Sequence, residues 1–115
     1  MNLDAGTTRC NSSICSKIRY RGVRADPGSF RMLRGEGALG SYAFSEGRPE
    51  HCFRNRCGVP LFGRGHIAEL GGDFVSVSVV TIDDASIGEL VAAPVMWCDG
   101  LNDNGWNSPG EIRHL

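Results

Sequence analysis

The sequence lacks three features that would each define a class of protein. No window of its 115 residues approaches the roughly 20 apolar residues of a membrane-spanning helix. The net charge is −1 at pH 7, whereas a nucleic-acid-binding domain usually carries a basic face. No basic, apolar leader precedes Cys10, so we expect no secretory signal and a cytoplasmic protein. The length suits one domain, and the hydropathy and charge lead us to expect no membrane or nucleic-acid partner.

The sequence also lacks an even number of cysteines. Five cysteines cannot all pair, and nothing indicates an oxidising compartment, so reduced thiols are expected. Clustered cysteines in a reducing compartment are more often metal ligands or catalytic groups than disulfides. Four of them form two pairs with equal spacing, Cys10 with Cys15 and Cys52 with Cys57. Cys98, between apolar neighbours, is predicted to be a small buried hydrophobic residue.

Glycine is abundant, and the pattern around it predicts a mainly β fold. Sixteen glycines are about twice the ordinary usage of roughly 7%. The clearest strand covers residues 74–80, where valines alternate with serines. A single helical turn is expected after the capping residues 83–86, and a short helix or turn at 17–20. Residues 55–72 are dense in turn signals. Further strands are predicted at residues 30–33, 39–44, 51–53 and 95–98.

The spacing of the cysteines leaves metal binding open. Zinc takes four tetrahedral ligands, and structural zinc turns place two cysteines two to four residues apart. Four intervening residues lie at the long end of that range, so two unlinked surface thiols remain the alternative for Cys10 and Cys15. Cys52 is expected to face the core from a strand. Cys57 is the most ligand-like cysteine because Gly58 follows it, although the positive charges of Arg54 and Arg56 oppose a divalent cation.

Several segments, spread in order over nearly the whole chain, match one family: residues 3–11, 13–17, 57–59, 62–65, 69–77, 82–84, 93–95 and 99–104. With these segments the chain resembles the glutathione-dependent formaldehyde-activating enzymes, a family that includes the centromere protein V group. The resemblance implies an Mss4-like fold of small coiled β-sheets, in one domain of residues 1–115.

The resemblance also implies where zinc ligands would lie. The family's catalytic motif is Cys-x-Cys-x-x-Cys; Cys10 and Cys15 match its outer cysteines, and Ser12 occupies the middle position. The family's structural zinc takes four cysteines. Cys57 matches the end of its Cys-x-x-Cys-Gly turn, and Arg54 stands where the first cysteine of that turn belongs. The other pair would lie upstream of residue 1, so we expect the domain to lack the usual N-terminal strand and its Cys-x-Cys pair. Cys52 matches no ligand position.

These departures affect the expected metal content. A serine hydroxyl holds its proton far more tightly than a thiol, so Ser12 is a poor zinc ligand near neutral pH. The guanidinium of Arg54 keeps its charge and would repel the ion. We therefore expect the structural zinc to be absent and the catalytic zinc to be held weakly through Cys10 and Cys15.

The resemblance implies a zinc-dependent carbon–sulfur lyase-type activity, in which formaldehyde and glutathione form S-hydroxymethylglutathione. No catalytic base stands out in the sequence, and surface or structural roles are favoured for every candidate. Candidate bases are His51, His66 and Glu69, and candidate partners for the carboxylates of glutathione are Arg19, Arg21 and Arg64.

Two other functions remain open. The changes at Ser12 and Arg54 favour a metal-free, inactive domain that is retained as a binding or structural unit. A nucleic-acid-binding zinc ribbon is disfavoured, because it needs two intact cysteine turns and a basic face.

Overall fold

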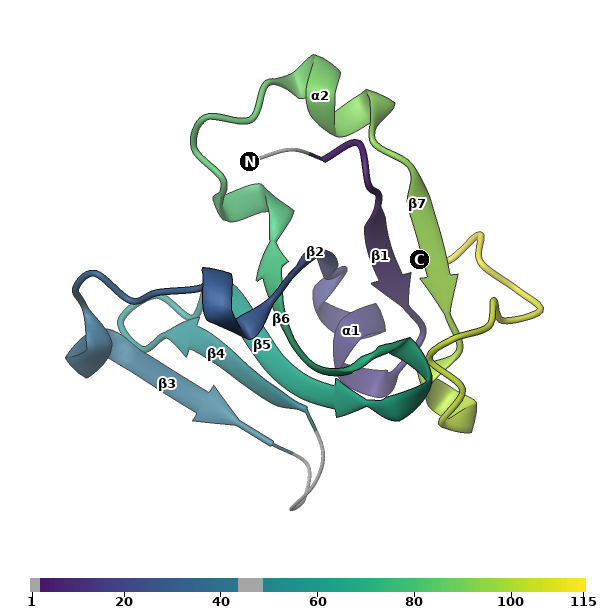
Figure 1. Cartoon of the computed structure of the whole chain (residues 1–115), viewed down its shortest axis with the longest axis horizontal. Helices are drawn as coiled ribbons and strands as arrows, with labels where there is room; N and C mark the ends of the chain where they lie inside the picture. Colours follow the sequence, from purple (N-terminus) through teal and green to yellow (C-terminus); the bar gives the residue numbers. More distant parts are fainter. Residues whose placement is uncertain (1–2, 44–48) are drawn as a thin grey trace. The chain divides into compact units, whose positions relative to one another are not determined.

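The computed structural model describes residues 3–43 and 49–115, and within them the fold is mainly β. The strands follow the hydrogen-bonded order β3-β4-β5-β6-β2-β1-β7 (Figure 1). Strands β1 and β7 run parallel, whereas the β1–β2, β3–β4, β4–β5 and β5–β6 pairs are antiparallel. The predicted mainly β class with short helical turns is therefore confirmed. No helix among the described residues is long and apolar enough to cross a membrane.

The described elements are short. The strands are β1 (Thr7–Cys10), β2 (Arg21–Ala25), β3 (Leu39–Tyr42), β4 (Glu50–Arg54), β5 (Pro60–Ile67), β6 (Gly72–Ser78) and β7 (Val95–Cys98). The α-helices are α1 (Ser13–Ile18) and α2 (Ile87–Ala92). The 3₁₀ turns are η1 (Pro27–Ser29), η2 (Glu36–Ala38), η3 (Ala68–Leu70), η4 (Val79–Thr81) and η5 (Gly100–Asn102).

The chain divides into two compact units, a subdivision that the sequence did not predict. The terminal unit combines Met1–Val23 with Val79–Leu115, and the central unit is Arg24–Ser78. Strand β2 passes from the first unit into the second.

Hydrogen bonds organise the interior of the terminal unit. Thr7 on β1 is completely buried; its hydroxyl donates to the carbonyl of Pro94 over 2.9 Å. The same oxygen accepts a hydrogen bond from Nε of Arg21 over 2.8 Å, and that guanidinium also donates to the carbonyl of Ala93. Buried polar groups need such partners, and here they join β1, β2 and the segment before β7.

Apolar packing organises the central unit. Strands β3 to β6 form an antiparallel meander around the buried side chains of Cys52, Phe62 and Val75. The rings of Phe30 and Phe62 lie 4.7 Å apart between centroids. The partly buried residues packed against this core are Phe30, Met32, Leu39, Leu61 and Val77.

Most of the predicted strands are present. Strand β7 has the predicted bounds, β4 contains residues 51–53, and β6 ends at Ser78, two residues earlier than expected. Strand β3 ends at Tyr42, and residue 44 of that prediction lies outside the described residues. Valine–serine alternation and β-branched residues therefore located the half-buried strands correctly.

One strand prediction is wrong, and one turn-rich segment contains a strand. Residues 30–33 form no strand, because the chain leaves the turn η1 irregularly and packs Phe30 and Met32 against the core. Residues 55–72 are dense in turn signals, yet they contain β5. The glycines of β5 suggested turns instead of a strand. A Cβ at Gly65 would lie 2.8 Å from the ring of Phe74. The glycine therefore serves close packing between strands and not a turn.

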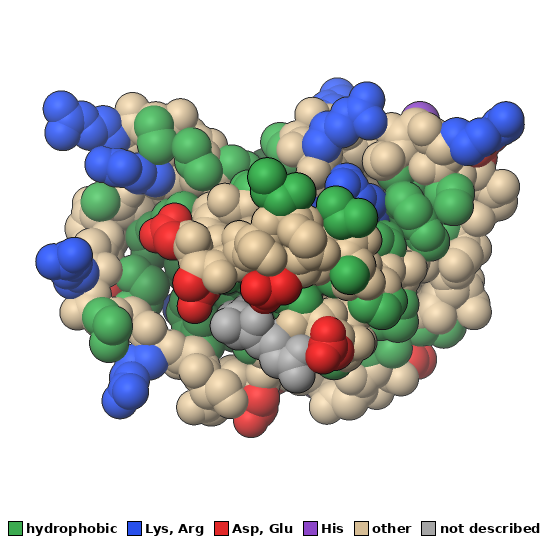
Figure 2. Space-filling view, turned by 90° about the horizontal axis from the view of Figure 1, so that it is seen from above, with side chains coloured by type: hydrophobic (Ala, Val, Ile, Leu, Met, Phe, Trp, Pro, Cys, Tyr) green, Lys and Arg blue, Asp and Glu red, His purple; other side chains and the backbone are tan. Residues whose placement is uncertain are grey.

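Side-chain caps fix both α-helices. Helix α1 begins at Ser13, earlier than the predicted 17–20, because the hydroxyl of Ser12 accepts the N–H of Cys15 over 3.3 Å. Ser86 caps α2 in the same way, within the predicted capping residues. Ile87 and Val91 of α2 are about four-fifths exposed, and Figure 2 shows hydrophobic side chains at the surface among polar and charged ones.

Candidate functional site

The predicted positions Cys10, Ser12 and Cys15 come together in one loop of the terminal unit. Strand β1 ends at Cys10, the chain turns, and Ser12 caps the helix that carries Cys15. The Cys15 thiol donates a hydrogen bond to the sulfur of Cys10, and the Ser12 side chain hydrogen-bonds to both cysteines. The four intervening residues therefore place both sulfurs and one hydroxyl in mutual contact.

Backbone groups surround the sulfur of Cys10. The N–H of Ser12 lies 3.5 Å from it, and the N–H of Gly100 also donates to it. A Cβ at Gly100 would lie 2.5 Å from that sulfur and 3.0 Å from the Cβ of Ser12. Only glycine lets the backbone of η5 come this close.

Asn11 ties the cysteine loop to the segment after β7. Its buried side chain donates to Oδ1 of Asp99 over 2.9 Å and accepts the N–H of Leu101 over 3.0 Å. Sequence reasoning missed Asn11 and Gly100 as parts of the site. The turn-rich segment after Cys98 was visible, but its position against Cys10 depends on pairing between strands almost ninety residues apart.

The two thiols of the loop differ in their electrostatics. The hydrogen bond from Cys15, aided by the N–H groups of Ser12 and Gly100, lowers the pKa of Cys10 to about 6, although burial opposes this. Donating that hydrogen bond, together with burial, raises the pKa of Cys15. The loop therefore favours one thiolate, on Cys10, held by one thiol, on Cys15.

Cys98 lies in the same neighbourhood. It is the register partner of Cys10 in the parallel β1–β7 pairing, and its carbonyl accepts the N–H of Asn11 over 3.1 Å. Cys98 is half-buried, and its charge contributes to raising the pKa of Cys15. Its interpretation as only a small hydrophobic residue therefore missed its place beside the loop.

The second cysteine pair is not brought together. Cys52 is 4% exposed in the apolar core, and its thiol donates to Oε1 of Glu50 over 3.1 Å. Burial, followed by that carboxylate, raises the pKa of Cys52 to about 11. Cys57 is exposed in the turn between β4 and β5. The equal spacing of the two pairs therefore has no common structural meaning.

Arg54 and Cys57 nevertheless share one tight turn. The N–H of Gly58 donates to the carbonyl of Arg54 over 2.7 Å, and Gly58 has φ = 77°, which glycine adopts without strain. This is the turn that the resemblance aligns with a Cys-x-x-Cys-Gly motif, with Arg54 in its first cysteine position. This geometry bears on the turn alone and leaves the expected absence of a structural zinc a prediction.

The candidate arginines have partners within the protein. Arg21 donates hydrogen bonds to the hydroxyl of Thr7 and the carbonyl of Ala93. Arg19 donates to the carbonyl of His114 over 3.1 Å. The guanidinium of Arg64 lies 5.2 Å from the centroid of the Phe62 ring and 3.8 Å from Glu50. For Arg21 the contacts favour a structural role.

The candidate bases lie outside the cysteine loop. His66 and Asp73 form an exposed pair 2.7 Å apart on β5 and β6 of the central unit. His51 is half-buried on β4, and burial lowers its pKa. Glu69 is exposed in η3. None of the three belongs to the unit that holds Cys10 and Cys15.

The donor set of the loop fits zinc in part. Thiolates are preferred zinc ligands, and the loop offers two sulfurs in contact with each other. The third position holds a hydroxyl, which binds zinc weakly. Among residues 3–43 and 49–115, no three His, Cys, Asp or Glu side chains are grouped so that they could hold a metal. Two sulfurs and one hydroxyl fall short of the four ligands that a closed structural zinc site takes.

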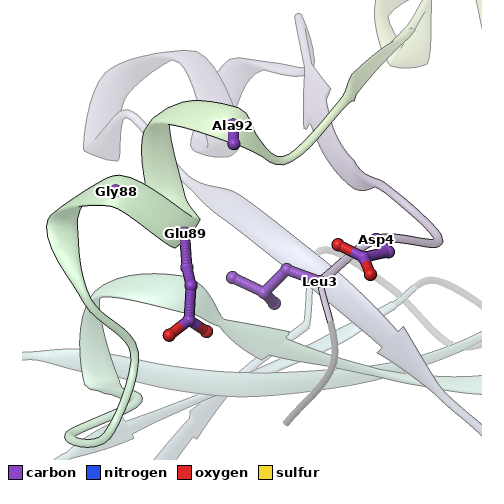
Figure 3. Close-up of a pocket in the computed structure, with 5 residues that line it drawn as sticks. All are labelled: Leu3, Asp4, Gly88, Glu89 and Ala92. Atoms are coloured by element: carbon purple, nitrogen blue, oxygen red, sulfur yellow. The ribbon is translucent and has the colours of Figure 1, made fainter.

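The described surface hollows lie away from the thiols. In the terminal unit, a hollow of about 410 Å³ is lined by Leu3, Asp4, Gly88, Glu89 and Ala92 (Figure 3). In the central unit, a second hollow of about 460 Å³ includes Phe30, Arg64 and His66 in its lining. Neither lining includes a cysteine.

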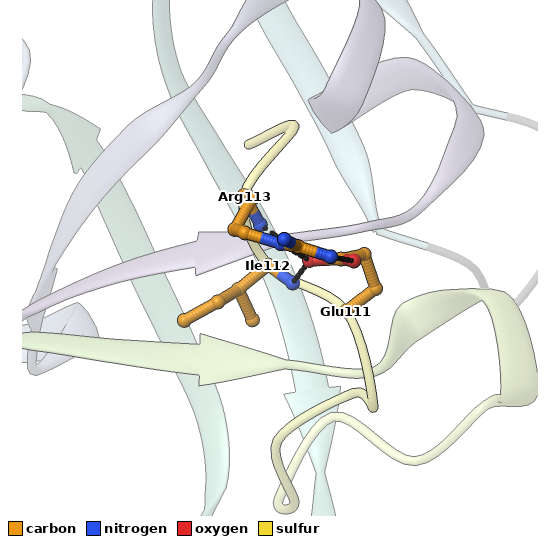
Figure 4. Close-up of polar contacts among 3 residues, drawn as sticks. All are labelled: Glu111, Ile112 and Arg113. Carbon is orange, nitrogen blue, oxygen red and sulfur yellow. Dashed lines mark hydrogen bonds and ion pairs between the residues drawn. The ribbon is translucent and has the colours of Figure 1, made fainter.

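The C-terminal segment carries a separate local contact. The guanidinium of Arg113 donates to the carboxylate of Glu111, with Nε 2.9 Å from Oε2 (Figure 4). The N–H groups of Ile112 and Arg113 donate to the same carboxylate. The Arg113 side chain, more than the backbone, holds the pKa of Glu111 at about 2.

Comparison with known proteins supports the fold. No family model matches the sequence. A crystal structure described as a Rhodobacter sphaeroides protein from a structural genomics programme is similar, with a TM-score of 0.64 and 22% identity over 80% of this chain and 82% of that chain. This similarity shows that a natural protein adopts the same mainly β arrangement.

Proposed function

We propose that this chain is a carbon–sulfur lyase-type protein similar to the glutathione-dependent formaldehyde-activating enzymes. Its substrates would be formaldehyde and a thiol such as glutathione, in the cytoplasm. One observation carries the proposal: Cys10, Ser12 and Cys15, at the three ligand positions that the resemblance implies, hydrogen-bond to one another in one loop. The proposed fold is of the Mss4-like kind, which agrees with the mainly β architecture.

The reaction forms one carbon–sulfur bond. The thiolate sulfur of glutathione attacks the carbonyl carbon of formaldehyde, and the carbonyl oxygen takes a proton to become the hydroxyl of the adduct. A zinc ion on Cys10 and Cys15 would supply Lewis acidity, which lowers the pKa of an entering thiol or polarises the aldehyde oxygen.

The chain's own groups prepare the loop for this chemistry. The N–H groups of Ser12 and Gly100 fix the sulfur of Cys10 and favour its negative charge. The Ser12 hydroxyl keeps Cys15 oriented through the cap of α1.

A metal-free domain is the second candidate, and one observation favours it. The Ser12 hydroxyl already accepts the N–H of Cys15, and the Cys15 thiol already donates to Cys10. The three polar side chains therefore satisfy one another without an ion. In this case the fold would act as a binding or structural unit.

Zinc content and adduct formation distinguish the two candidates. The purified chain would be assayed for zinc by mass spectrometry and for formaldehyde–glutathione adduct formation by exchange NMR. We expect substoichiometric zinc and a measurable rate, both lost in Cys10→Ser and both increased by Ser12→Cys. Cys57→Ser, in an exposed turn, is the matched control and should change neither.

Two outcomes would contradict the proposal. A natural chain without zinc and without rate enhancement would favour the metal-free domain, particularly if Ser12→Cys restores both. A rate that persists in Cys10→Ser and Cys15→Ser would place any activity elsewhere in the molecule.

A further inference from the structure

Three arginines gather at one end of the β1–β2 pairing in the terminal unit. Arg9 and Arg21 are register partners in this antiparallel pair, so their side chains lie on the same face of the sheet. Thr7 shares that face, because side chains two residues apart in a strand point the same way. Nε of Arg21 donates to the hydroxyl of Thr7 over 2.8 Å, so the Arg21 side chain follows this face. Arg19, the C-cap residue of α1, is two residues before Arg21 and adds a third charge close to Arg9.

Hydrogen bonds to backbone carbonyls hold two of these side chains in place. Nη2 of Arg21 donates to the carbonyl of Ala93 over 3.2 Å, and Nη1 of Arg19 donates to the carbonyl of His114 over 3.1 Å. A guanidinium has five N–H donors, so both side chains are positioned and still have donors for a further acceptor.

The charge of this cluster is not compensated by the part of the chain that the structure describes. Within residues 3–43 and 49–115, no acidic side chain forms an ion pair with Arg9, Arg19 or Arg21. Burial, followed by the charges of Arg21 and Arg19, lowers the pKa of Arg9. A guanidinium nevertheless keeps its charge at every ordinary pH, so the three side chains repel one another unless an anion is bound.

Two other arginines show the contrast, because each has a carboxylate partner. Arg64 borders the hollow of the central unit, where it lies 3.8 Å from Glu50. Arg113 donates to Glu111 in the exposed C-terminal segment. An anion at either place would compete with an acid of the protein itself, whereas an anion at the cluster on β1 and β2 would not.

We propose that Arg9, Arg19 and Arg21 bind a phosphate group, supplied by inorganic phosphate or by a small phosphorylated molecule. A carboxylate is planar, carries one charge and is matched by one guanidinium. A tetrahedral phosphate carries a charge of about −1.5 to −2 near pH 7 and can accept hydrogen bonds from several guanidiniums at once.

This phosphate site is distinct from the cysteine loop. Arg9 and Cys10 are successive residues of β1, so their side chains point to opposite faces of the sheet. Phosphate binding therefore goes beyond the proposed carbon–sulfur activity and depends on neither metal nor aldehyde.

A titration followed by NMR of the arginine Nε–H signals tests the site. The full-length chain, treated with chelator and kept free of aldehyde and glutathione, is titrated with inorganic phosphate and with phenyl phosphate. Sodium chloride at equal ionic strength is the reference, because it screens charges without matching the guanidinium geometry. We expect saturable shifts of the Arg9, Arg19 and Arg21 signals with phosphate and none with chloride. Similar affinities for the two probes favour inorganic phosphate as the ligand, and tighter binding of phenyl phosphate favours a phosphorylated molecule.

Substitutions at Arg9 sharpen the result. Arg9→Gln should weaken phosphate binding at least about tenfold, because a charged hydrogen-bond donor is lost. Arg9→Lys keeps the charge but loses the planar fork, so its affinity should lie between the two. Arg34→Gln, at an exposed arginine of the central unit, is the matched control and should bind phosphate as the natural chain does. Cys10→Ser should also leave phosphate binding unchanged.

Unfolding in urea separates binding from a structural role of Arg9. Without phosphate, Arg9→Gln should be at least as stable as the natural chain, because the substitution removes repulsion. With phosphate at about ten times its dissociation constant, the folding equilibrium constant of the natural chain should rise about 11-fold, and that of Arg9→Gln about twofold at most.

The proposal is overturned if phosphate shifts these signals no more than chloride does, or if Arg9→Gln binds phosphate as tightly as the natural chain. It is also overturned if S-methylglutathione, which carries carboxylates but no free thiol, binds in place of phosphate. Should Arg9→Gln fail to fold, Arg19→Gln at an exposed residue provides the same comparison. A chain without zinc or adduct formation can still bind phosphate, so failure of the two proposals can be told apart.

Discussion

The terminal and central units each contain a cysteine pair with the same spacing, but they place the two pairs in different environments. Each holds a cysteine pair with four intervening residues, and each has a small buried interior. In the terminal unit, Cys10 and Cys15 meet because a serine cap turns the chain into a helix between them. In the central unit, a strand carries Cys52 into the core and a turn leaves Cys57 at the surface. Equal spacing therefore gives different chemistry when the local backbone differs.

The two units also differ in the interactions that hold their interiors together. The central unit packs Cys52, Phe62 and Val75 together, whereas the terminal unit adds to its buried apolar residues the hydrogen-bonded networks of Thr7 and Asn11. Apolar packing tolerates approximate shapes, but a buried polar network needs every partner in place. The terminal unit thus holds its loop in one geometry, which suits a reactive site.

The largest expected effect is on the apolar interior. Phe62 is 6% exposed and its ring packs at a tilt against that of Phe30, so Phe62→Ala should lower the free energy of unfolding by about 3–5 kcal/mol. Urea unfolding followed by fluorescence measures this. Leu33→Ala, at a residue 86% exposed, is the matched control and should change stability by less than about 0.5 kcal/mol. Equal losses of unfolding free energy in Phe62→Ala and Leu33→Ala would refute the conclusion that apolar packing around Phe62 stabilises the central unit.

The next prediction compares the rates at which Cys10 and Cys52 are alkylated at pH 7. With pKa values of about 6 for Cys10 and about 11 for Cys52, the thiolate fractions differ by about four orders of magnitude. The lower nucleophilicity of the more acidic thiolate offsets about two of these, so Cys10 should be alkylated about 100-fold faster than Cys52.

A time course of iodoacetamide labelling followed by peptide mass spectrometry checks this ratio. The Cys10 rate should fall to half its plateau near pH 6, because protonation of the thiolate removes the nucleophile below that pH. In urea the ratio should approach one. Comparable alkylation rates of Cys10 and Cys52 in the folded chain would contradict the predicted difference between their pKa values.

A smaller effect tests the polar interior. Thr7→Val keeps the shape but leaves the guanidinium of Arg21 without its 2.8 Å acceptor, and should cost about 1–3 kcal/mol of unfolding free energy. Thermal and urea unfolding give the value. The control, Thr8→Val, breaks only a 3.4 Å contact to the carbonyl of Gly22, so it should cost clearly less. A neutral Thr7→Val would mean that the network is dispensable.

The smallest effect concerns the exposed C-terminal contact. Arg113→Ala should raise the pKa of Glu111 from about 2 toward its ordinary value of about 4.3, because the guanidinium donors are lost. A carbon-detected NMR titration measures it. The contact favours the folded geometry above the ordinary pKa and is lost as pH falls through about 2. An unchanged pKa in the variant would show that the backbone N–H groups alone hold the carboxylate.

Sequence reasoning located much of the fold because some of its signals are local. Alternating valines and serines identified β6, and an Asp–Ser cap identified the start of α2. It missed β1 and β2, whose polar residues show no alternation, and β5, whose glycines suggested turns. Those strands form because partner strands complete their hydrogen bonds and, at Gly65, because a ring needs the space.

The features of the candidate site are likewise divided between those that the sequence predicts and those that tertiary structure decides. The sequence by itself determined which residues could carry thiol chemistry and that Ser12 stands between Cys10 and Cys15. It could not determine that Gly100 and Asn11 shape the loop, or that Cys98 lies opposite Cys10, since parallel pairing of β1 with β7 brings these residues together. Residue type sets which bonds a side chain can make, but tertiary structure decides which partners it meets and so the pKa of each thiol.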